Sequence, residues 1–238
     1  MSDVRGFLAA IPYSDGVRDA IPLRLGALVL VLAAVSVALA VVAETAERLG
    51  PFAHEWLAYN LFLAWLPLAF AFVTVRTPGR MALLPAVLWL AFLPNAPYLV
   101  TDLIHVGEGG GDVAYDALLI GAAATVGLVL GGLSLALVQA RVAVAAGARA
   151  GWLFAYGVLV LAGLGVYIGR VLRWNSWDAF VRPLDIVSDI AASGAKVMAE
   201  PGLFSAGLVL AVVFLAAYGA CFRLAERDFA VLSERARR

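Results

Sequence analysis

The amino-acid sequence predicts an all-α, polytopic membrane protein with six transmembrane helices, and three observations lead to this prediction. The chain is 63% hydrophobic and only 14% charged, whereas about a quarter of the residues in a typical soluble protein are charged. Its uncharged apolar runs are each close to the roughly 20 residues that a helix needs to cross a bilayer. These runs are continuous, whereas the strands of a membrane β-barrel alternate between apolar and polar residues.

The positions of the apolar runs define the expected domain organisation. We expect a cytoplasmic or interfacial lead-in at residues 1–24, a transmembrane domain at 25–222 and a cytoplasmic tail at 223–238. The expected spans are 25–43, 56–75, 81–101, 117–140, 150–169 and 201–222. The first run has a longer apolar core than the roughly 7–15 residues of a signal peptide, so we expect it to be retained as an anchor.

The distribution of basic residues predicts the orientation of the chain. Of the 17 Lys and Arg residues, twelve fall on the same side as the N-terminus and five fall on the opposite side. Basic residues concentrate in cytoplasmic loops, so this bias predicts that the N- and C-termini both lie inside. The formal net charge is zero, so no overall field favours nucleic acid as a partner.

Two further patterns concern the packing of the helices. Gly127-x-x-x-Gly131 and Gly165-x-x-x-Gly169 place small residues on one helix face, which predicts close helix contacts within the bundle. Between spans five and six, apolar residues recur at near-helical spacing from Leu184 to Met198. We expect residues 183–197 to form an amphipathic helix that lies in the outer interface.

The third expected span carries two helix breakers near its outer end. Pro94 and Pro97 each remove a backbone donor and clash with the preceding turn, so the helix should kink or break there. Asn95 lies where its amide can satisfy the backbone carbonyls that are freed. Such a break either serves helix packing alone or marks a buried or water-filled site.

Polar residues follow this break. Asp102 and His105 share one helix face at i, i+3, and Asp116 lies at the start of the fourth span. Two carboxylates and an imidazole can act as acid–base groups or hold a divalent ion, although solvated loop charges explain them equally well. The chain has two histidines and one cysteine, so we expect no cofactor and no zinc-type metal centre.

A basic and aromatic cluster ends the fifth span. Arg170 and Arg173 lie one turn apart and can present a paired cationic face to a phosphate or carboxylate. The alternative is an aromatic–basic interfacial anchor in which Asp178 pairs with Arg182 at i, i+4.

The two clusters emerge on the same expected side of the membrane, which leads to a hypothesis about a site. We expect Arg170 or Arg173 to pair with Asp102 or Asp116, because an unpaired charge next to an apolar run is costly. The second arginine and His105 would then be free to meet an anionic ligand. The candidate outer-face site consists of Asn95, Asp102, His105, Asp116, Arg170, Arg173, Trp174, Asn175 and Asp178.

Several segments of the chain also resemble a known family. The segments are 61–67 (LFLAWLP), 94–103 (PNAPYLVTDL), 115–116 (YD) and 170–178 (RVLRWNSWD). Between roughly Trp56 and Met198 the chain resembles domain-of-unknown-function family 1361, a group of predicted bacterial integral membrane proteins. The resemblance implies a multi-pass protein of the bacterial cytoplasmic (inner) membrane, and it supplies no catalytic residue.

Three classes of function stay open at this point. The apolar runs contain no charged residue and no histidine, which disfavours a transporter because transporters keep ionisable groups within the membrane. We therefore expect a non-enzymatic component that binds a lipid or protein partner through its extracytoplasmic face. Its partners would be membrane lipids, with an anionic head group or another membrane protein as the specific ligand. The alternatives are an enzyme acting on a lipid head group or lipid-linked substrate at the outer leaflet, and a small-solute or lipid transporter.

Overall fold

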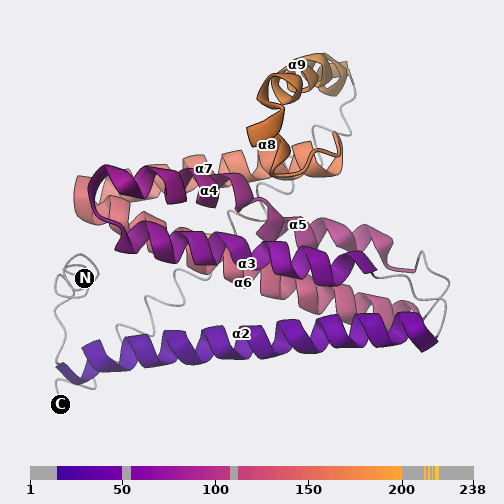
Figure 1. Cartoon of the computed structure of the whole chain (residues 1–238), viewed down its shortest axis with the longest axis horizontal. Coiled ribbons are helices and arrows are strands. Elements are labelled where there is room, and N and C mark those ends of the chain that lie inside the picture. The colour runs from indigo at the N-terminus through magenta and orange to yellow at the C-terminus, as the bar shows by residue number, and fades with distance from the viewer. Residues whose placement is uncertain are drawn as a thin grey trace.

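The computed structural model describes residues 15–49, 55–107 and 112–199, together with positions 212, 214, 216, 218 and 219. These residues form helices and turns and contain no strand (Figure 1). The α-helices are α2 (Asp15–Leu49), α3 (Glu55–Arg76), α4 (Leu83–Phe92), α5 (Asn95–Thr101), α6 (Val113–Ala146), α7 (Ala148–Arg170), α8 (Asp178–Val181) and α9 (Pro183–Ala199). Two 3₁₀ turns, η1 (Gly79–Ala82) and η2 (Asp102–His105), flank α4 and α5.

Among the residues that the structure describes, five helical segments are long and apolar enough to cross a membrane, which confirms the predicted all-helical membrane architecture. They are Gly26–Thr45, Trp56–Arg76, Gly79–His105, Val113–Ala146 and Arg149–Arg170. The expected sixth span at 201–222 lies outside the described residues except for five positions, and so does the tail at 223–238. Helix α2 begins at Asp15, so the first helix starts within the segment expected as a lead-in.

The outer surface of this bundle is strongly apolar. Large side chains such as Leu30, Leu118 and Leu153 are more than 70% exposed although they lie in the middle or at the start of long helices. A soluble monomer rarely exposes apolar side chains in such continuous patches. Helices that face lipid do so routinely, so the surface agrees with the length and composition of the helices.

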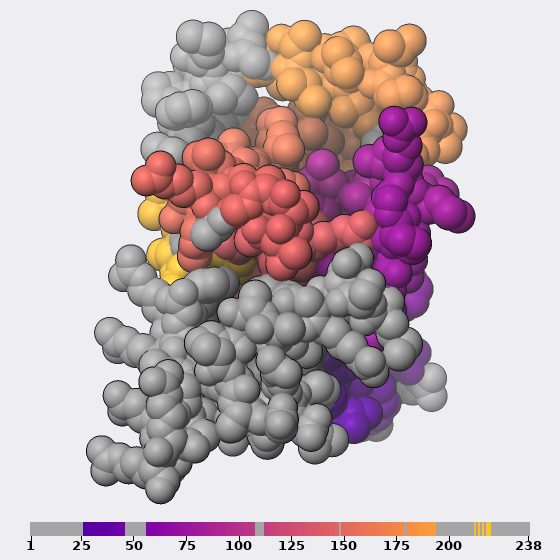
Figure 2. All heavy atoms as spheres, turned by 90° about the vertical axis from the view of Figure 1, so that its left-hand side faces the viewer, coloured from indigo at the N-terminus to yellow at the C-terminus, as the bar shows by residue number. Residues whose placement is uncertain are grey.

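Helix α6 occupies the centre of the bundle and packs against α2, α3, α5 and α7. One buried cluster joins α2, α3 and α6 around Leu57, Leu61 and Leu130. A second cluster joins α4, α6 and α7 around Trp89 and Val166. Figures 1 and 2 show the resulting order, with α2 at one edge of the bundle and α9 at the opposite edge, beyond α7.

The third span is broken where the two prolines predict it. Helix α4 ends at Phe92, and α5 begins at Asn95 after a short turn. The amide of Ala96 donates to the carbonyl of Leu93 (3.2 Å), so it no longer serves the carbonyl of Phe92, its usual helical acceptor. The Asn95 side chain donates to that carbonyl instead, over 2.8 Å. The expected capping role of Asn95 is therefore confirmed.

The two glycine motifs hold this break from both sides. A Cβ atom added at Gly127 on α6 would lie 2.3 Å from the carbonyl oxygen of Ala96. A Cβ atom added at Gly165 on α7 would lie 2.3 Å from the ring of Pro94. Only glycine permits such close approach of a neighbouring segment, so the predicted helix-packing role of both motifs is confirmed.

The segment after α7 turns back over the end of the bundle. Helix α9 covers the residues expected to form an amphipathic helix, and Ile186 is buried while Leu184 and Val187 are exposed. The indole of Trp174 donates to Asp189 on α9 over 2.9 Å. That α9 lies in the outer interface of a membrane remains a prediction.

Candidate functional site

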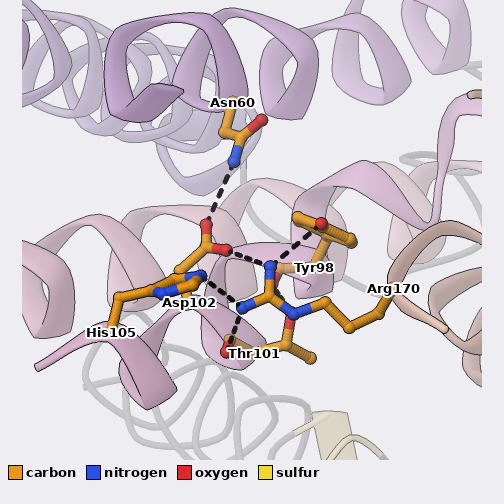
Figure 3. Close-up of polar contacts among 6 residues, drawn as sticks. All are labelled: Asn60, Tyr98, Thr101, Asp102, His105 and Arg170. Carbon is orange, nitrogen blue, oxygen red and sulfur yellow. Dashed lines mark hydrogen bonds and ion pairs between the residues drawn. The ribbon is translucent and has the colours of Figure 1, made fainter. Parts of the chain in front are cut away.

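The polar network at this end of the bundle centres on Arg170, the last residue of α7 (Figure 3). Its Nη1 donates to the Tyr98 hydroxyl (3.0 Å) and forms an ion pair with Asp102 Oδ1 (3.1 Å). Its Nη2 donates to the Thr101 carbonyl (3.1 Å) and lies 2.8 Å from His105 Nε2. A guanidinium has five N–H groups and no acceptor, so four of the five are used here.

The carboxylate of Asp102 is almost fully buried, with 1% of the residue exposed. One oxygen takes the ion pair with Arg170, and the other accepts from Asn60 Nδ2 on α3 over 3.1 Å. A buried carboxylate is tolerated only when it is paired and hydrogen-bonded. Both conditions are met, and of the expected pairings of Arg170 or Arg173 with Asp102 or Asp116, the one between Arg170 and Asp102 occurs.

The local backbone explains how Asp102 and His105 reach the same guanidinium. Both belong to η2, and residues at i and i+3 eclipse each other in a 3₁₀ turn. Because a guanidinium only donates, His105 Nε2 must accept from Arg170, which assigns the ring proton to Nδ1. The ring also contacts Trp56, with centroids 5.4 Å apart.

The structure corrects two expectations, namely that His105 is free to bind an anion and that Arg173 shares a helix face with Arg170. His105 is engaged by Arg170, and Arg173 does not share a helix face with Arg170 because α7 ends at Arg170. Arg173 has a positive φ of 59° and is exposed. Within the described part of the chain, Arg173 forms no ion pair.

The other expected site residues fall into different places. Asp116 is buried in the first turn of α6 and accepts from the amide of Gly107 over 3.0 Å. Asp178 accepts from the amide of Asn175 over 2.8 Å. The expected pair between Asp178 and Arg182 is wrong, because Arg182 pairs with Asp185 at 2.7 Å.

The candidate spans extend beyond the apolar runs and include ionisable residues near their ends. The candidate span Gly79–His105 contains Asp102 and His105, and the span Val113–Ala146 contains Asp116. The apolar runs themselves contain no charged residue and no histidine, but the helices extend beyond them and include these three residues. Helical backbone continues past the apolar runs because the polar side chains there satisfy one another, as the Arg170 network shows.

A cavity of about 200 Å³ lies beside this network. Asn60 and Tyr98 belong to both, since they contact the network and also line the cavity. At about 30 Å³ per water, the cavity has room for roughly six waters. The residues that line it are Tyr59, Asn60, Leu63, Ala91, Pro94, Asn95, Tyr98, Gly165, Ile168, Gly169, Trp174, Asn175, Ser176, Trp177 and Ile186.

The cavity brings together three segments that are far apart in the sequence. Asn95 at the break in span three donates to Ser176 Oγ, after the end of α7, over 2.9 Å. Tyr59 on α3 and Trp177 stack edge to face, with centroids 6.5 Å apart. Asn95, Trp174 and Asn175 of the expected site thus lie around the cavity, whereas Asp102, His105 and Arg170 lie behind its wall.

Sequence reasoning missed Asn60, Tyr98, Thr101 and Ser176 as parts of this region. Two signals were available in the sequence: Asn60 is a polar residue inside the second apolar run, and Ser176 lies between two tryptophans. Neither signal has a fixed spacing to Asp102 or Asn95, so neither could be joined to them without a fold.

A bundle of apolar helices with a broken span, a buried ion network and a polar cavity at one end defines a polytopic helical membrane protein. The family model described as "Protein of unknown function (DUF1361)" matches residues 59–217. The chain belongs to this family, as the resemblance in its motifs predicts. No curated protein and no solved structure matches the chain.

Proposed function

We propose that the chain is a non-enzymatic protein of the bacterial cytoplasmic membrane that binds the head group of a membrane lipid at its extracytoplasmic face. The observation that carries this proposal is the cavity between α3, the break of span three and the exit of α7. Cavities that bind small groups are concave, largely apolar and furnished with a few fixed polar side chains. Asn60, Asn95 and Ser176 provide such side chains among aromatic walls.

The side of the membrane is inferred from the basic residues. Twelve of the 17 Lys and Arg residues lie in segments expected on the side of the N-terminus, which favours a cytoplasmic location for that side. The α5 end of the bundle would then face outward. Tyr59, Trp174 and Trp177 at the cavity fit this position, because Tyr and Trp concentrate where helices meet the membrane–water interface.

The placement of the acid–base groups supports binding over catalysis. Asp102 and His105 both contact Arg170, and neither lines the cavity. A general acid or base must lie within hydrogen-bonding reach of the reacting group. Within the described residues, no three His, Cys, Asp or Glu side chains gather in a way that could hold a metal ion.

Native mass spectrometry of the purified full chain tests the proposal by detecting bound lipid. Ala91 lines the cavity and makes no side-chain hydrogen bond, so Ala91→Phe fills the space without removing a polar contact. We expect a retained lipid on the natural chain and its loss in Ala91→Phe. Ala117→Phe is the matched control, because Ala117 is exposed on α6.

Lipid that is retained equally by both phenylalanine variants would contradict the proposal, since it would lie outside the cavity. Absence of bound lipid from the natural chain, purified in several mild detergents, would contradict it as well. A photoreactive lipid that crosslinks to Tyr59 or Trp177 in the natural chain, and not in Ala91→Phe, would locate the head group directly.

One observation favours a transporter as a second candidate. The ion pair of Asp102 and Arg170 lies at the ends of two candidate spans and beside a discontinuous helix. Broken helices and paired charges at a binding site recur in secondary transporters. Uptake of solute or lipid into proteoliposomes that contain the chain, abolished by Ala91→Phe, would favour this candidate over a binding component.

A further inference from the structure

The ligand chemistry follows from which hydrogen-bonding groups the cavity leaves open. We infer that the cavity binds a hydroxyl-rich, uncharged head group of the sugar or glycerol type, and not a phosphate. This inference rests on the proposed function. The amide groups of two asparagines in the cavity wall, Asn60 and Asn95, are oriented by fixed partners.

Asn60 turns its carbonyl oxygen away from the ion network. Its neighbour Asp102 is an acceptor, so only the NH₂ end of Asn60 can face it, and Nδ2 donates to Asp102 Oδ2 over 3.1 Å. Figure 3 shows the Asn60 oxygen on the opposite side from this bond. The charged pair behind the wall therefore determines that Asn60 offers an acceptor to the cavity it lines.

Asn95 is oriented in the same way by different partners. Its Nδ2 donates to the Phe92 carbonyl (2.8 Å) and to Ser176 Oγ (2.9 Å). Both N–H groups are used, so the amide retains only its Oδ1 as an open group. The cavity thus contains two carbonyl acceptors whose direction is set by the protein.

Two hydroxyl groups add open donors. The Tyr98 oxygen accepts from Arg170, and the Ser176 oxygen accepts from Asn95. Within the described residues neither hydroxyl hydrogen has an acceptor. Tyr98 and Ser176 line the cavity, so both can donate to a ligand there.

This combination of fixed acceptors and open donors selects among ligand classes. A phosphate only accepts and an ammonium only donates, whereas a hydroxyl group does both. The described residues that line the cavity carry no charge, and Arg170 has already used all four terminal N–H groups. Phosphate sites are typically built on free arginine or lysine donors, and the exposed Arg173 does not line the cavity.

The walls and size of the cavity fit the same class. The aromatic rings of Tyr59, Trp174 and Trp177 line it, and their electron-rich faces attract the slightly positive C–H groups of a sugar or glycerol unit. About 200 Å³ is below the roughly 300 Å³ of the smallest drug-sized pockets. A single ring or a glycerol unit is therefore the appropriate size.

The test compares lipids that share dioctanoyl-glycerol tails and differ only in the head group. The full chain, purified in a detergent without a sugar head group, is titrated with the glucosyl lipid, its fully acetylated form and phosphatidic acid, with tryptophan fluorescence as the signal. We expect the glucosyl lipid to bind at least about tenfold more tightly than either other lipid. Acetylation removes the hydroxyl donors that Asn60 and Asn95 would accept, and the variants Tyr98→Phe and Ser176→Ala separate the loss of hydrogen bonds from the added bulk of the acetyl groups.

Two conservative variants locate the effect. Tyr98→Phe and Ser176→Ala keep the walls and remove one hydroxyl each, so each should weaken the glucosyl lipid about three- to tenfold. Binding of phosphatidic acid should not weaken, because each change also frees an N–H donor of Arg170 or Asn95. Thr125→Ala, which removes an exposed hydroxyl from α6, is the matched control and should leave all three affinities unchanged. If Tyr98→Phe does not fold, Ser176→Ala alone still gives the comparison.

The outcomes separate this inference from the proposed function. Tightest binding of phosphatidic acid, lost in Ala91→Phe, would overturn the hydroxyl inference and leave lipid binding in place. Equal affinity for the glucosyl lipid and its acetylated form would overturn it as well. Free glucose that binds as tightly as the glucosyl lipid would support the hydroxyl chemistry and contradict the proposal that the ligand is a lipid.

Discussion

The Arg170 network and the adjoining cavity share Asn60 and Tyr98, yet they are opposite in character. In the network, both oxygens of Asp102 and four N–H groups of Arg170 have partners. In the cavity, oriented carbonyl oxygens and hydroxyl hydrogens lack them. The difference teaches that the charged residues, which are the more conspicuous ones in the sequence, orient the uncharged residues Asn60 and Tyr98 that line the cavity.

Removal of the arginine should have the largest effect on stability. Arg170→Met leaves the buried Asp102 carboxylate without its cation, which typically costs about 3–5 kcal/mol. The free energy of unfolding, measured by denaturant titration in mixed micelles, should fall accordingly. Arg173→Met is the matched control, because Arg173 is exposed, and its effect should stay within about 0.5 kcal/mol.

Adding Asp102→Asn to Arg170→Met should recover part of the loss, because the buried negative charge is then removed. We expect a coupling of roughly 0.5–3 kcal/mol in the double-mutant cycle. Strictly additive effects would show that Asp102 and Arg170 are not energetically coupled. They would contradict the description of the Arg170 network as a set of mutually satisfied partners.

The second prediction concerns the glycine contact that holds the broken helix. Gly127→Ala places a Cβ atom 2.3 Å from the Ala96 carbonyl oxygen, and such overpacking typically costs about 1–3 kcal/mol. Gly121→Ala on the same helix meets nothing within 4 Å. It should be neutral or stabilising by up to about 1 kcal/mol. Similar destabilisation by both changes, in the same unfolding titration, would refute the close approach.

A smaller effect is expected at the cap of the break. Asn95→Ala leaves the Phe92 carbonyl without the side-chain donor that reaches it over 2.8 Å, and an unsatisfied buried group costs about 1–3 kcal/mol. Asn95 is only half-buried, so water compensates in part and we expect about 1 kcal/mol. Thr125→Ala should change the unfolding midpoint by less. An Asn95→Ala variant as stable as the natural chain would show that the hydrogen bond from Asn95 to Phe92 does not stabilise the break.

The last prediction tests the side of the membrane and the placement of α9 through thiol accessibility, in a Cys221→Ala background. An impermeant maleimide added to intact cells should label Ser188→Cys, which is exposed on α9, and label Ile186→Cys poorly because Ile186 is buried. Arg80→Cys should be labelled only after the cells are permeabilised. Labelling of Arg80→Cys in intact cells would reverse the orientation and place the cavity on the cytoplasmic face.

The sequence predicts the parts of this structure that depend on local chemistry. The broken span follows from Pro94 and Pro97, and its cap follows from the position of Asn95. An ion pair between an arginine after span five and a carboxylate of the acidic segment follows from charges that leave apolar helices at the same end of the bundle, and the structure selects Arg170 and Asp102 from the expected combinations. In each case the cost of an unsatisfied group is large enough to predict that the group has a partner.

The remaining parts depend on contacts that no spacing reveals. Asn60 lies 42 residues from Asp102, and only the packing of α3 beside α5 joins them. Arg173 was expected on the face of Arg170, but the chain leaves the helix at that point and Arg173 adopts a positive φ of 59°. Few residues other than glycine take such a backbone conformation, so helical spacing cannot anticipate it.

The contacts of Pro94 and Ala96 also decide which parts of the molecule are able to move. A proline break in a helix is a common place for a hinge, but here the carbonyl of Ala96 lies against α6 and the ring of Pro94 lies against α7, where only glycines leave room. Rotation about the break would drive it into both neighbours, so α4, α5, α6 and α7 should move as one rigid body. The other cavity walls, from α3 and from the segment between Trp174 and Ile186, are not held by these two glycine contacts. The segment after α7 is instead connected to α9 through the indole of Trp174, which donates to Asp189 and is covered by the guanidinium of Arg182.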